Sequence, residues 1–246
     1  MGFWFALQFL TIIPSPFHRQ PEAKEIGSAI TYFPLIGIIT GAVLYAVDWG
    51  LSGIFPQAVV GALILAVWVL ISGAMHLDGL IDTCDGLGGD TASKRLKIMA
   101  DSHAGAYGVI GALVVLLIKY ALLVSLSEAW KLEALLLAPM LGSWALVLAI
   151  FIFPYARKSG GLGKRFKSGV SKRRFTLATL LALVGSFILA GWPGLIIAAA
   201  ALLTTLAIGY FFNSRLGGLT GDVYGAIREI TEAVILMLIP MIAGFF

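Results

Sequence analysis

The chain has 246 residues, of which 59% are hydrophobic and only 12% are charged, and its mean hydropathy is +0.97. Soluble globular domains carry about 45–50% apolar and about 25% charged residues. This composition therefore excludes a soluble enzyme, a disordered tail and a nucleic-acid-binding domain. The formal net charge of +4 becomes informative only once the charges are located along the chain.

Seven apolar stretches are long enough to form membrane-spanning helices, which need about 20 residues. They cover residues 30–52, 56–77, 104–127, 134–154, 175–191, 194–212 and 224–246. Because lipid cannot satisfy backbone polar groups, each stretch is expected to be helical. A Pro-Gly pair within Gly191-Trp192-Pro193-Gly194 predicts a tight turn between the fifth and sixth spans.

A shorter apolar run, from Phe3 to Ile13, ends at Pro14 and is too short to cross a bilayer. It predicts an interfacial or re-entrant helix. The sequence thus predicts an all-α, polytopic integral membrane protein with about seven transmembrane helices plus a short N-terminal helix. We expect residues 1–246 to form a single transmembrane helical domain.

The basic residues are distributed unevenly between the two sides of these spans. With the N-terminus in the cytoplasm, the inward loops are 14–29, 78–103, 155–174 and 213–223. These loops and the adjoining start of the last helix hold 15 of the 17 Lys and Arg residues. By the positive-inside rule, this predicts a multi-pass protein of the cytoplasmic (inner) membrane whose active face is toward the cytoplasm.

Acidic residues gather just after the second span, where Asp78, Asp82 and Asp85 would share a helix face about 60° wide. Three neighbouring anions beside a low-dielectric slab cost energy unless a cation neutralises them. Oxygen-only ligands suit Mg²⁺, and an incomplete ligand shell leaves positions for phosphate oxygens. The pattern predicts a Mg²⁺ site at these three residues. The alternative is a solvated acidic loop paired with Lys94, Arg95 and Lys97.

Three further residues of this region have local interpretations. Asp101 either caps the third span or adds a carboxylate to the cluster. On a regular helix, His76 points away from the carboxylates and is interpreted as a packing or interfacial residue. Cys84 is the only cysteine, so no internal disulfide is expected, and it is interpreted as a small filler.

A glycine-rich turn leads into the last span. Backbone N–H groups of such a turn can bind an anion at a helix N-terminus, which makes Gly217, Gly218, Thr220 and Gly221 candidate substrate-binding residues. The alternative is a flexible turn with Thr220 or Asp222 as the N-cap. Beyond it, Glu229 and Glu232 enter the membrane boundary, where ionisable residues are functional candidates by default.

The loop from Tyr155 to Arg174 has eight basic residues and no acid. Membrane topology and attraction to anionic lipid both explain this charge. Arg157 and Lys158 lie nearest the fourth span and are the best candidates for binding a pyrophosphate.

Several motifs together resemble those of the cobalamin synthase, or adenosylcobinamide-GDP ribazoletransferase, family. They are Phe9-Leu10-Thr11-Ile12-Ile13-Pro14, Tyr32-Phe33-Pro34-Leu35-Ile36-Gly37, His76-Leu77-Asp78-Gly79 through Asp85-Gly86, Asp101-Ser102, and Gly217-Gly218-Leu219-Thr220-Gly221-Asp222. Two positions depart from the family pattern. His103 stands where the family usually has Arg, and Ala100 stands where it has a basic residue, so a phosphate-binding role is not carried over to either position.

The resemblance implies a Mg²⁺-dependent transferase. A ribose hydroxyl of α-ribazole, or of its 5′-phosphate, would attack the phosphate next to cobinamide in adenosylcobinamide-GDP, and GMP would leave. We expect Asp82, Asp101 and Asp222 to be catalytic, with Asp101 or Asp222 either completing the metal site or accepting the hydroxyl proton. The expected partners are these corrinoid and α-ribazole substrates and membrane lipid, without nucleic acid. The sequence leaves open whether the protein forms a homo-oligomer.

Two other functions are weighed against this one. A CDP-alcohol phosphotransferase would share the pattern from Asp82 to Gly86, but Gly89-Asp90 replace its Ala-Arg and no second half of the motif follows. A transporter should carry ionisable residues near the membrane midplane, whereas only Asp48 and Lys119 lie inside the first six spans.

Overall fold

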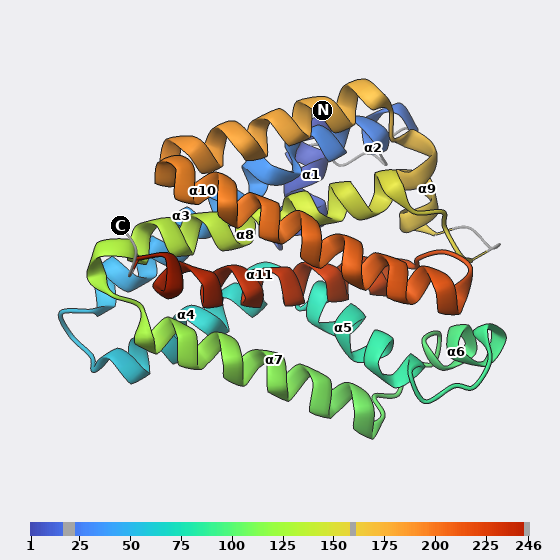
Figure 1. Cartoon of the computed structure of the whole chain (residues 1–246), viewed down its shortest axis with the longest axis horizontal. Helices are drawn as coiled ribbons and strands as arrows, with labels where there is room; N and C mark the ends of the chain where they lie inside the picture. Colours follow the sequence, from blue (N-terminus) through green and yellow to red (C-terminus); the bar gives the residue numbers. More distant parts are fainter. Residues whose placement is uncertain (17–22, 158–160, 244–246) are drawn as a thin grey trace.

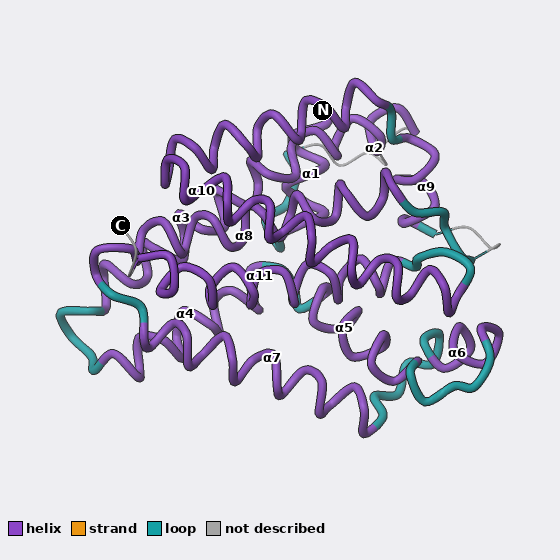
Figure 2. The backbone as a smooth tube through the Cα atoms, in the orientation of Figure 1, coloured by secondary structure: helices purple, strands orange, loops and turns teal. Residues whose placement is uncertain are grey.

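The computed structural model describes residues 1–16, 23–157 and 161–243, and most of them are helical (Figure 1, Figure 2). The helices are α1 (Gly2–Leu10), α2 (Ala23–Ala29), η1 (Ile30–Tyr32), α3 (Phe33–Leu51), α4 (Gln57–Ile71), α5 (Met75–Gly86), α6 (Ala92–Ile98), α7 (Ala106–Ser125), η2 (Glu128–Trp130), α8 (Lys131–Ile152), α9 (Leu162–Gly169), α10 (Lys172–Leu216) and α11 (Gly221–Ala243). The predicted all-α class is confirmed.

Four helical segments within the described ranges are long and apolar enough to cross a membrane. They are Glu25–Leu51, Ala106–Ser125, Glu128–Ile152 and Lys172–Leu216. Helices α4 and α5 meet the same test only as a pair, which would make five. The protein is therefore an all-helical membrane protein, while the number of seven spans stays a prediction.

Helix α8 forms the centre of the bundle and packs against α3, α10 and α11. Every residue from Ala134 to Ile150 is buried, as expected for a helix that is apolar on all sides. Gly37 and Gly41 of α3 allow the closest of these contacts. A Cβ atom added at either glycine would lie 2.3 Å from a backbone carbonyl oxygen of α8. Small residues at this spacing let two membrane helices approach closely.

The predicted turn between 175–191 and 194–212 is confirmed as a reversal inside α10. Gly191 has the non-helical angles φ 60° and ψ −141°, and the two halves of α10 run back along each other (Figure 1). A Cβ atom at Gly194 would lie 2.0 Å from the Ser186 carbonyl oxygen. Glycine is needed at both positions, at the first for its positive φ and at the second for the close approach.

The prediction of one continuous helix over 56–77 is wrong. Helix α4 ends at Ile71, helix α5 begins at Met75, and their axes differ by 87°. Gly73 and Ala74 adopt left-handed angles, with φ of 60° and 57°. Two consecutive left-handed residues cannot continue a right-handed helix, so the chain turns sharply. The bend brings α5 against both α7 and α11.

The predicted N-terminal helix forms as α1, and it packs on α2, η1 and α3. Ala6, Leu7 and Leu10 are buried on its inner face. Just beyond α1, the Ile12 amide donates to the Ile71 carbonyl at 2.8 Å, which ties the segment to the end of α4. Its interfacial or re-entrant location in a membrane stays a prediction.

A network of four buried charges joins α7 to α11. The Lys119 Nζ lies 2.6 Å from a carboxylate oxygen of both Glu229 and Glu232, and the Arg228 Nε donates to Glu232 at 2.9 Å. Lys119 also lies 4.7 Å from the centroid of the Trp68 ring. Two cations thus offset two anions, so the acidic residues of α11 have a structural explanation. Their alternative role as site residues is not needed.

Replacing Lys119 by methionine should strongly destabilise the protein. The substitution Lys119→Met leaves Glu229 buried without its cation and Glu232 with Arg228 alone, and breaking a buried ion pair typically costs about 3–5 kcal/mol. Thermal unfolding of the purified protein in detergent measures the loss. The control Lys94→Met removes an exposed pair with Asp90 at 3.2 Å and should cost about 0–1 kcal/mol. Equal melting temperatures for wild type and Lys119→Met would contradict the proposed role of the network.

Candidate functional site

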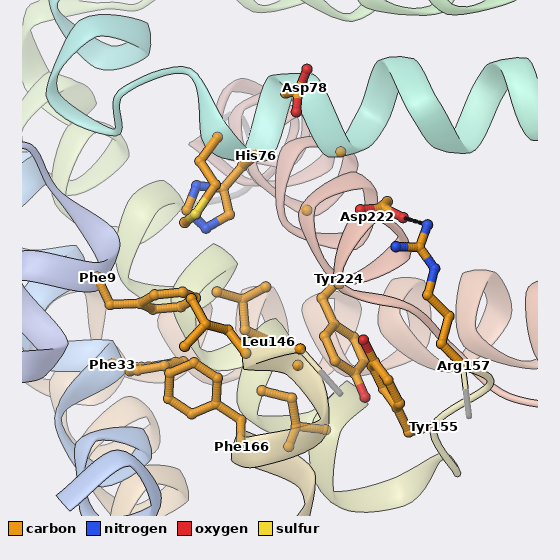
Figure 3. Close-up of a pocket in the computed structure, with 18 residues that line it drawn as sticks. Phe9, Phe33, His76, Asp78, Leu146, Tyr155, Arg157, Phe166, Asp222 and Tyr224 are labelled. Atoms are coloured by element: carbon orange, nitrogen blue, oxygen red, sulfur yellow. Dashed lines mark hydrogen bonds and ion pairs between the residues drawn. The ribbon is translucent and has the colours of Figure 1, made fainter. Parts of the chain in front are cut away.

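A cavity of about 270 Å³ lies among α1, α3, α5, α8, α9 and the first turns of α11 (Figure 3). Its two ends differ in chemistry. Asp78, Asp222 and Arg157 line one end, and aromatic and aliphatic side chains line the other, with Tyr155 and Tyr224 between the two ends. Such a combination of apolar wall and a few converging charges is typical of ligand sites.

The glycine-rich turn builds the ionic end through its backbone shape. Gly217 has φ 72°, and its amide donates to the Asn213 carbonyl at 2.9 Å, which ends α10. Gly218 has φ 153°, and a Cβ atom there would lie 2.8 Å from the Ala156 nitrogen. Both positions therefore require glycine, one for the helix end and one for the contact with segment 154–157.

This turn pairs with the segment that follows α8. Tyr155 and Leu219 form an isolated parallel β-bridge. The Ala156 amide donates to the Leu219 carbonyl at 2.8 Å, and the Leu219 amide donates to the Pro154 carbonyl at the same distance. The pairing holds Arg157 beside the start of α11.

Arg157 and Asp222 form the central ion pair of the ionic end. The Arg157 Nη2 donates to Asp222 Oδ2 at 2.7 Å and to the Met99 carbonyl at 3.0 Å (Figure 3). Thr220 accepts from the Val223 amide at 3.3 Å as the N-cap of α11 and donates to Asp222 at 3.2 Å. Burial raises the pKa of Asp222, and the Arg157 guanidinium opposes this effect.

The predicted substrate-binding residues therefore separate into two groups. Arg157 and Gly221 line the cavity, whereas Gly217, Gly218 and Thr220 have the local structural roles described above and are not among its described lining residues. Lys158 lies outside the described residues. The alternative interpretation of Thr220 as a helix cap matches its hydrogen bonds.

Asp78 and Asp82 of α5 lie close to Asp222. A Cβ atom at Gly79 would lie 2.8 Å from the Asp222 carbonyl oxygen, so this glycine lets the two helices touch. Asp82 lies in α5, outside the predicted membrane span 56–77. Burial, together with the nearby charges of Asp222 and Asp78, raises the pKa of Asp82 to about 6, although Arg157 lowers it. Among the described residues, this region therefore carries negative charge that Arg157 neutralises only in part.

Asp85 is positioned differently from the expected third metal ligand. Its two carboxylate oxygens accept the backbone amides of Gly105 at 2.7 Å and Gly108 at 2.8 Å. Asp85 thus caps the start of α7, where a negative charge is favourable. In the described part of the chain, no three His, Cys, Asp or Glu side chains are grouped so that they could hold a metal ion. The predicted cluster of Asp78, Asp82 and Asp85 is accordingly not formed.

Asp101 also departs from its expected place, because it lies in an exposed turn before α7. Its carboxylate accepts the His103 amide at 3.1 Å and lies 2.7 Å from the His103 ring nitrogen. The hydrogen bonds from His103, side chain first, lower the pKa of Asp101. Asp101 is not among the described residues that line the cavity, so its predicted catalytic role has no support in this arrangement.

Several cavity residues were not anticipated from the sequence. His76, interpreted as a packing or interfacial residue, is indeed buried, and it also lies at the cavity wall with Arg228 Nη1 3.3 Å from its Nε2. Phe166 is the only aromatic residue in the otherwise polar α9, which is a signal that could have marked it. Tyr155 and Tyr224 flank charged motifs and carry no distinctive spacing.

Together, the long apolar helices and the partly charged cavity define an integral membrane protein with a binding site built between its helices. The chain belongs to the family described as cobalamin-5-phosphate synthase, whose model matches residues 2–240. Every described residue that lines the cavity falls within this matched range.

Curated relatives match almost the whole chain, and each of the following is named adenosylcobinamide-GDP ribazoletransferase. The protein of Desulforamulus reducens is 40% identical over 235 residues, which cover 95% of this chain and 94% of the relative. That of Roseiflexus is 39% identical over 239 residues, covering 97% and 88%. That of Geotalea daltonii is 37% identical over 246 residues, covering 99% and 98%. No solved structure matches this chain.

The different surroundings of Asp82 and Asp85 predict different effects of the same substitution on stability. Asp85→Asn exchanges one acceptor oxygen for an amide donor that faces a backbone N–H, which should cost about 1–3 kcal/mol. Asp82→Asn removes repulsion from Asp78 and Asp222, so its melting temperature should equal or exceed that of the wild type. Thermal unfolding in detergent compares the two. If Asp85→Asn melted at the wild-type temperature, the capping role would be wrong.

Proposed function

We propose that this protein joins adenosylcobinamide-GDP to α-ribazole, or to α-ribazole 5′-phosphate, and releases GMP. The product would be adenosylcobalamin or its 5′-phosphate, the last assembly step of cobalamin biosynthesis. The observation that carries this proposal is the family match over residues 2–240, which includes both ends of the cavity. The names of relatives that are 37–40% identical support it.

The reaction is a displacement at phosphorus. A ribose hydroxyl of α-ribazole forms a new P–O bond to the phosphate next to cobinamide, and the bond from that phosphate to GMP breaks. The hydroxyl loses its proton, and the leaving GMP carries away the electron pair of the broken bond. Negative charge grows on the oxygens around phosphorus, where a guanidinium such as that of Arg157 is stabilising.

We assign the proton acceptor role to Asp222. Burial raises the pKa of its carboxyl, which makes it a better base than an ordinary carboxylate. The 2.7 Å contact with Arg157 would keep this carboxylate beside the cation that faces the phosphate. In this scheme Arg157 stabilises and orients, and Asp222 takes up the proton at its carboxylate oxygen.

The enzyme is further proposed to require Mg²⁺, with Asp78 and Asp82 of α5 as the carboxylates that would hold it. Carboxylate oxygens are the donors that this ion prefers, and burial together with the charges of Asp222 and Asp78 raises the pKa of Asp82, an environment in which a cation is stabilising. Such a small set of carboxylates would leave coordination positions for phosphate oxygens. When bound, the ion would offset charge on the diphosphate.

The finer location of the protein is also a proposal. We place it in the cytoplasmic membrane with the cavity open toward the cytoplasm. The positive-inside charge pattern supports this orientation, and α6, α9 and the turn between α10 and α11 gather at one end of the bundle (Figure 1). Corrinoid and α-ribazole substrates and membrane lipid would be its partners.

The two other functions weighed from the sequence gain no support. The charges buried within the apolar segments are paired, since Lys119 contacts two glutamates and Asp48 lies 3.3 Å from Lys131. Paired charges of this kind favour a structural role over a transport path. The family match likewise favours ribazole transfer over CDP-alcohol chemistry.

Removing divalent cations should stop the reaction. The assay follows formation of the corrinoid product by purified protein supplied with adenosylcobinamide-GDP and α-ribazole. Excess chelator should abolish turnover, and added Mg²⁺ should restore it, whereas Ca²⁺ should restore less because it prefers a larger oxygen shell. Full activity in excess chelator would contradict the metal proposal. Absence of turnover under every cation condition would instead contradict the proposed reaction.

A further inference from the structure

The end of the cavity away from Asp222 is an aromatic pocket formed by side chains from four helices. Phe9 comes from α1, Phe33 from α3 and Phe166 from α9 (Figure 3). The centroid of the Phe166 ring lies 4.6 Å from that of Phe9 and 5.5 Å from that of Phe33. Leu146 and Ile150 of α8 complete this end. We call these five residues the aromatic pocket.

No side chain of the aromatic pocket carries a hydrogen-bond donor or acceptor. Phe33 and Phe166 are almost fully buried, whereas Phe9 is half-buried. A polar ligand edge in contact with these five side chains would therefore lose its hydrogen bonds to water without replacement, which is costly. The wall suits a flat, apolar aromatic group that can pack against phenylalanine rings.

We infer that the aromatic pocket binds the base of the attacking nucleoside. This inference rests on the proposed function, because that function supplies a nucleoside whose base is a benzimidazole, a flat and mostly apolar ring system with a single ring-nitrogen acceptor. The cavity lining indicates which part of the site holds the base and which chemical class of base fits there. The base is recognised by shape and by apolar contact rather than by hydrogen bonds to its edge.

The cavity fits this occupant better than it fits the other parts of the substrates. Guanine presents several donors and acceptors on its edges, and the five pocket side chains could satisfy none of them. A corrin ring with its amide side chains is far too large for a cavity of about 270 Å³. A single nucleoside is of the right order of size, since pockets for drug-sized ligands begin at about 300 Å³.

The order of surfaces along the cavity also matches the order of groups in a nucleoside. The aromatic pocket is followed by Tyr155 and Tyr224, whose ring centroids are 6.4 Å apart, and then by Arg157 and Asp222 (Figure 3). A base in the aromatic pocket would place its ribose beside the two tyrosines. The ribose hydroxyls would then face the ion pair, where the phosphate is attacked.

The test uses one variant from each of two helices and a matched control. Phe166→Leu and Phe9→Leu remove rings that line the aromatic pocket. Phe5→Leu removes a ring from the same helix as Phe9, which contacts Phe166 at a centroid distance of 6.1 Å but is not among the described cavity-lining residues. Phe5→Leu therefore loses a similar amount of ring packing as the two pocket variants but leaves the wall of the cavity unchanged.

Steady-state kinetics with both substrates give the expected result. The KM for α-ribazole should rise about tenfold in Phe166→Leu and Phe9→Leu, because an aromatic contact is lost. The KM for adenosylcobinamide-GDP should stay within about twofold, as should both constants in Phe5→Leu. The wild-type preference for α-ribazole over an α-linked adenine nucleoside should also fall in the two pocket variants.

Equilibrium binding of α-ribazole alone, measured calorimetrically in detergent, gives a readout that does not need turnover. Weaker binding by the pocket variants than by Phe5→Leu supports the inference even if a variant is inactive. An unchanged affinity, or an equal rise in KM for both substrates, would overturn it. A wild-type protein that makes no corrinoid product would instead overturn the proposed function, so the two failures are distinguishable.

Discussion

The close contact between α5 and α11 determines where the charged side chains of the site lie. Each helix contributes a glycine that packs against the backbone of the other. A Cβ atom at Gly79 of α5 would lie 2.8 Å from the Asp222 carbonyl oxygen, and one at Gly225 of α11 would lie 2.9 Å from the His76 carbonyl oxygen. Without side chains at these positions, the helices approach closely enough for Asp222 to influence Asp82. A larger separation would disperse the site.

The charged side chains of the protein lie in two different electrostatic environments. Deep between α7 and α11, Lys119 and Arg228 neutralise Glu229 and Glu232 through contacts of 2.6–2.9 Å. Such a network holds helices together and leaves no charge for chemistry. Near the cavity, burial and the charges of Asp222 and Asp78 raise the pKa of Asp82 to about 6, and Arg157 offsets this effect only in part. This imbalance distinguishes the candidate site from the structural ion pairs.

The sequence predicted local features well, and it missed those that depend on contacts between distant segments. Apolar length indicated the helices, and Gly191 with Pro193 marked the reversal in α10. The bend at Gly73 was not predicted, although the Ser72-Gly73 pair that interrupts the apolar stretch is a common turn signal. Helical spacing placed Asp85 beside Asp82, but only the packing of α5 on α7 assigns its carboxylate to the amides of Gly105 and Gly108.

The helix contact can be tested directly by the substitution Gly79→Ala, with turnover as the measurement. The added methyl group must push α5 from α11, and a displacement of about 1 Å at reacting groups can cost about 100-fold in rate. We expect kcat to fall by that order while the protein remains folded. Gly50→Ala should turn over normally, since its Cβ atom would meet nothing within 4 Å. Wild-type kcat in Gly79→Ala would contradict the account.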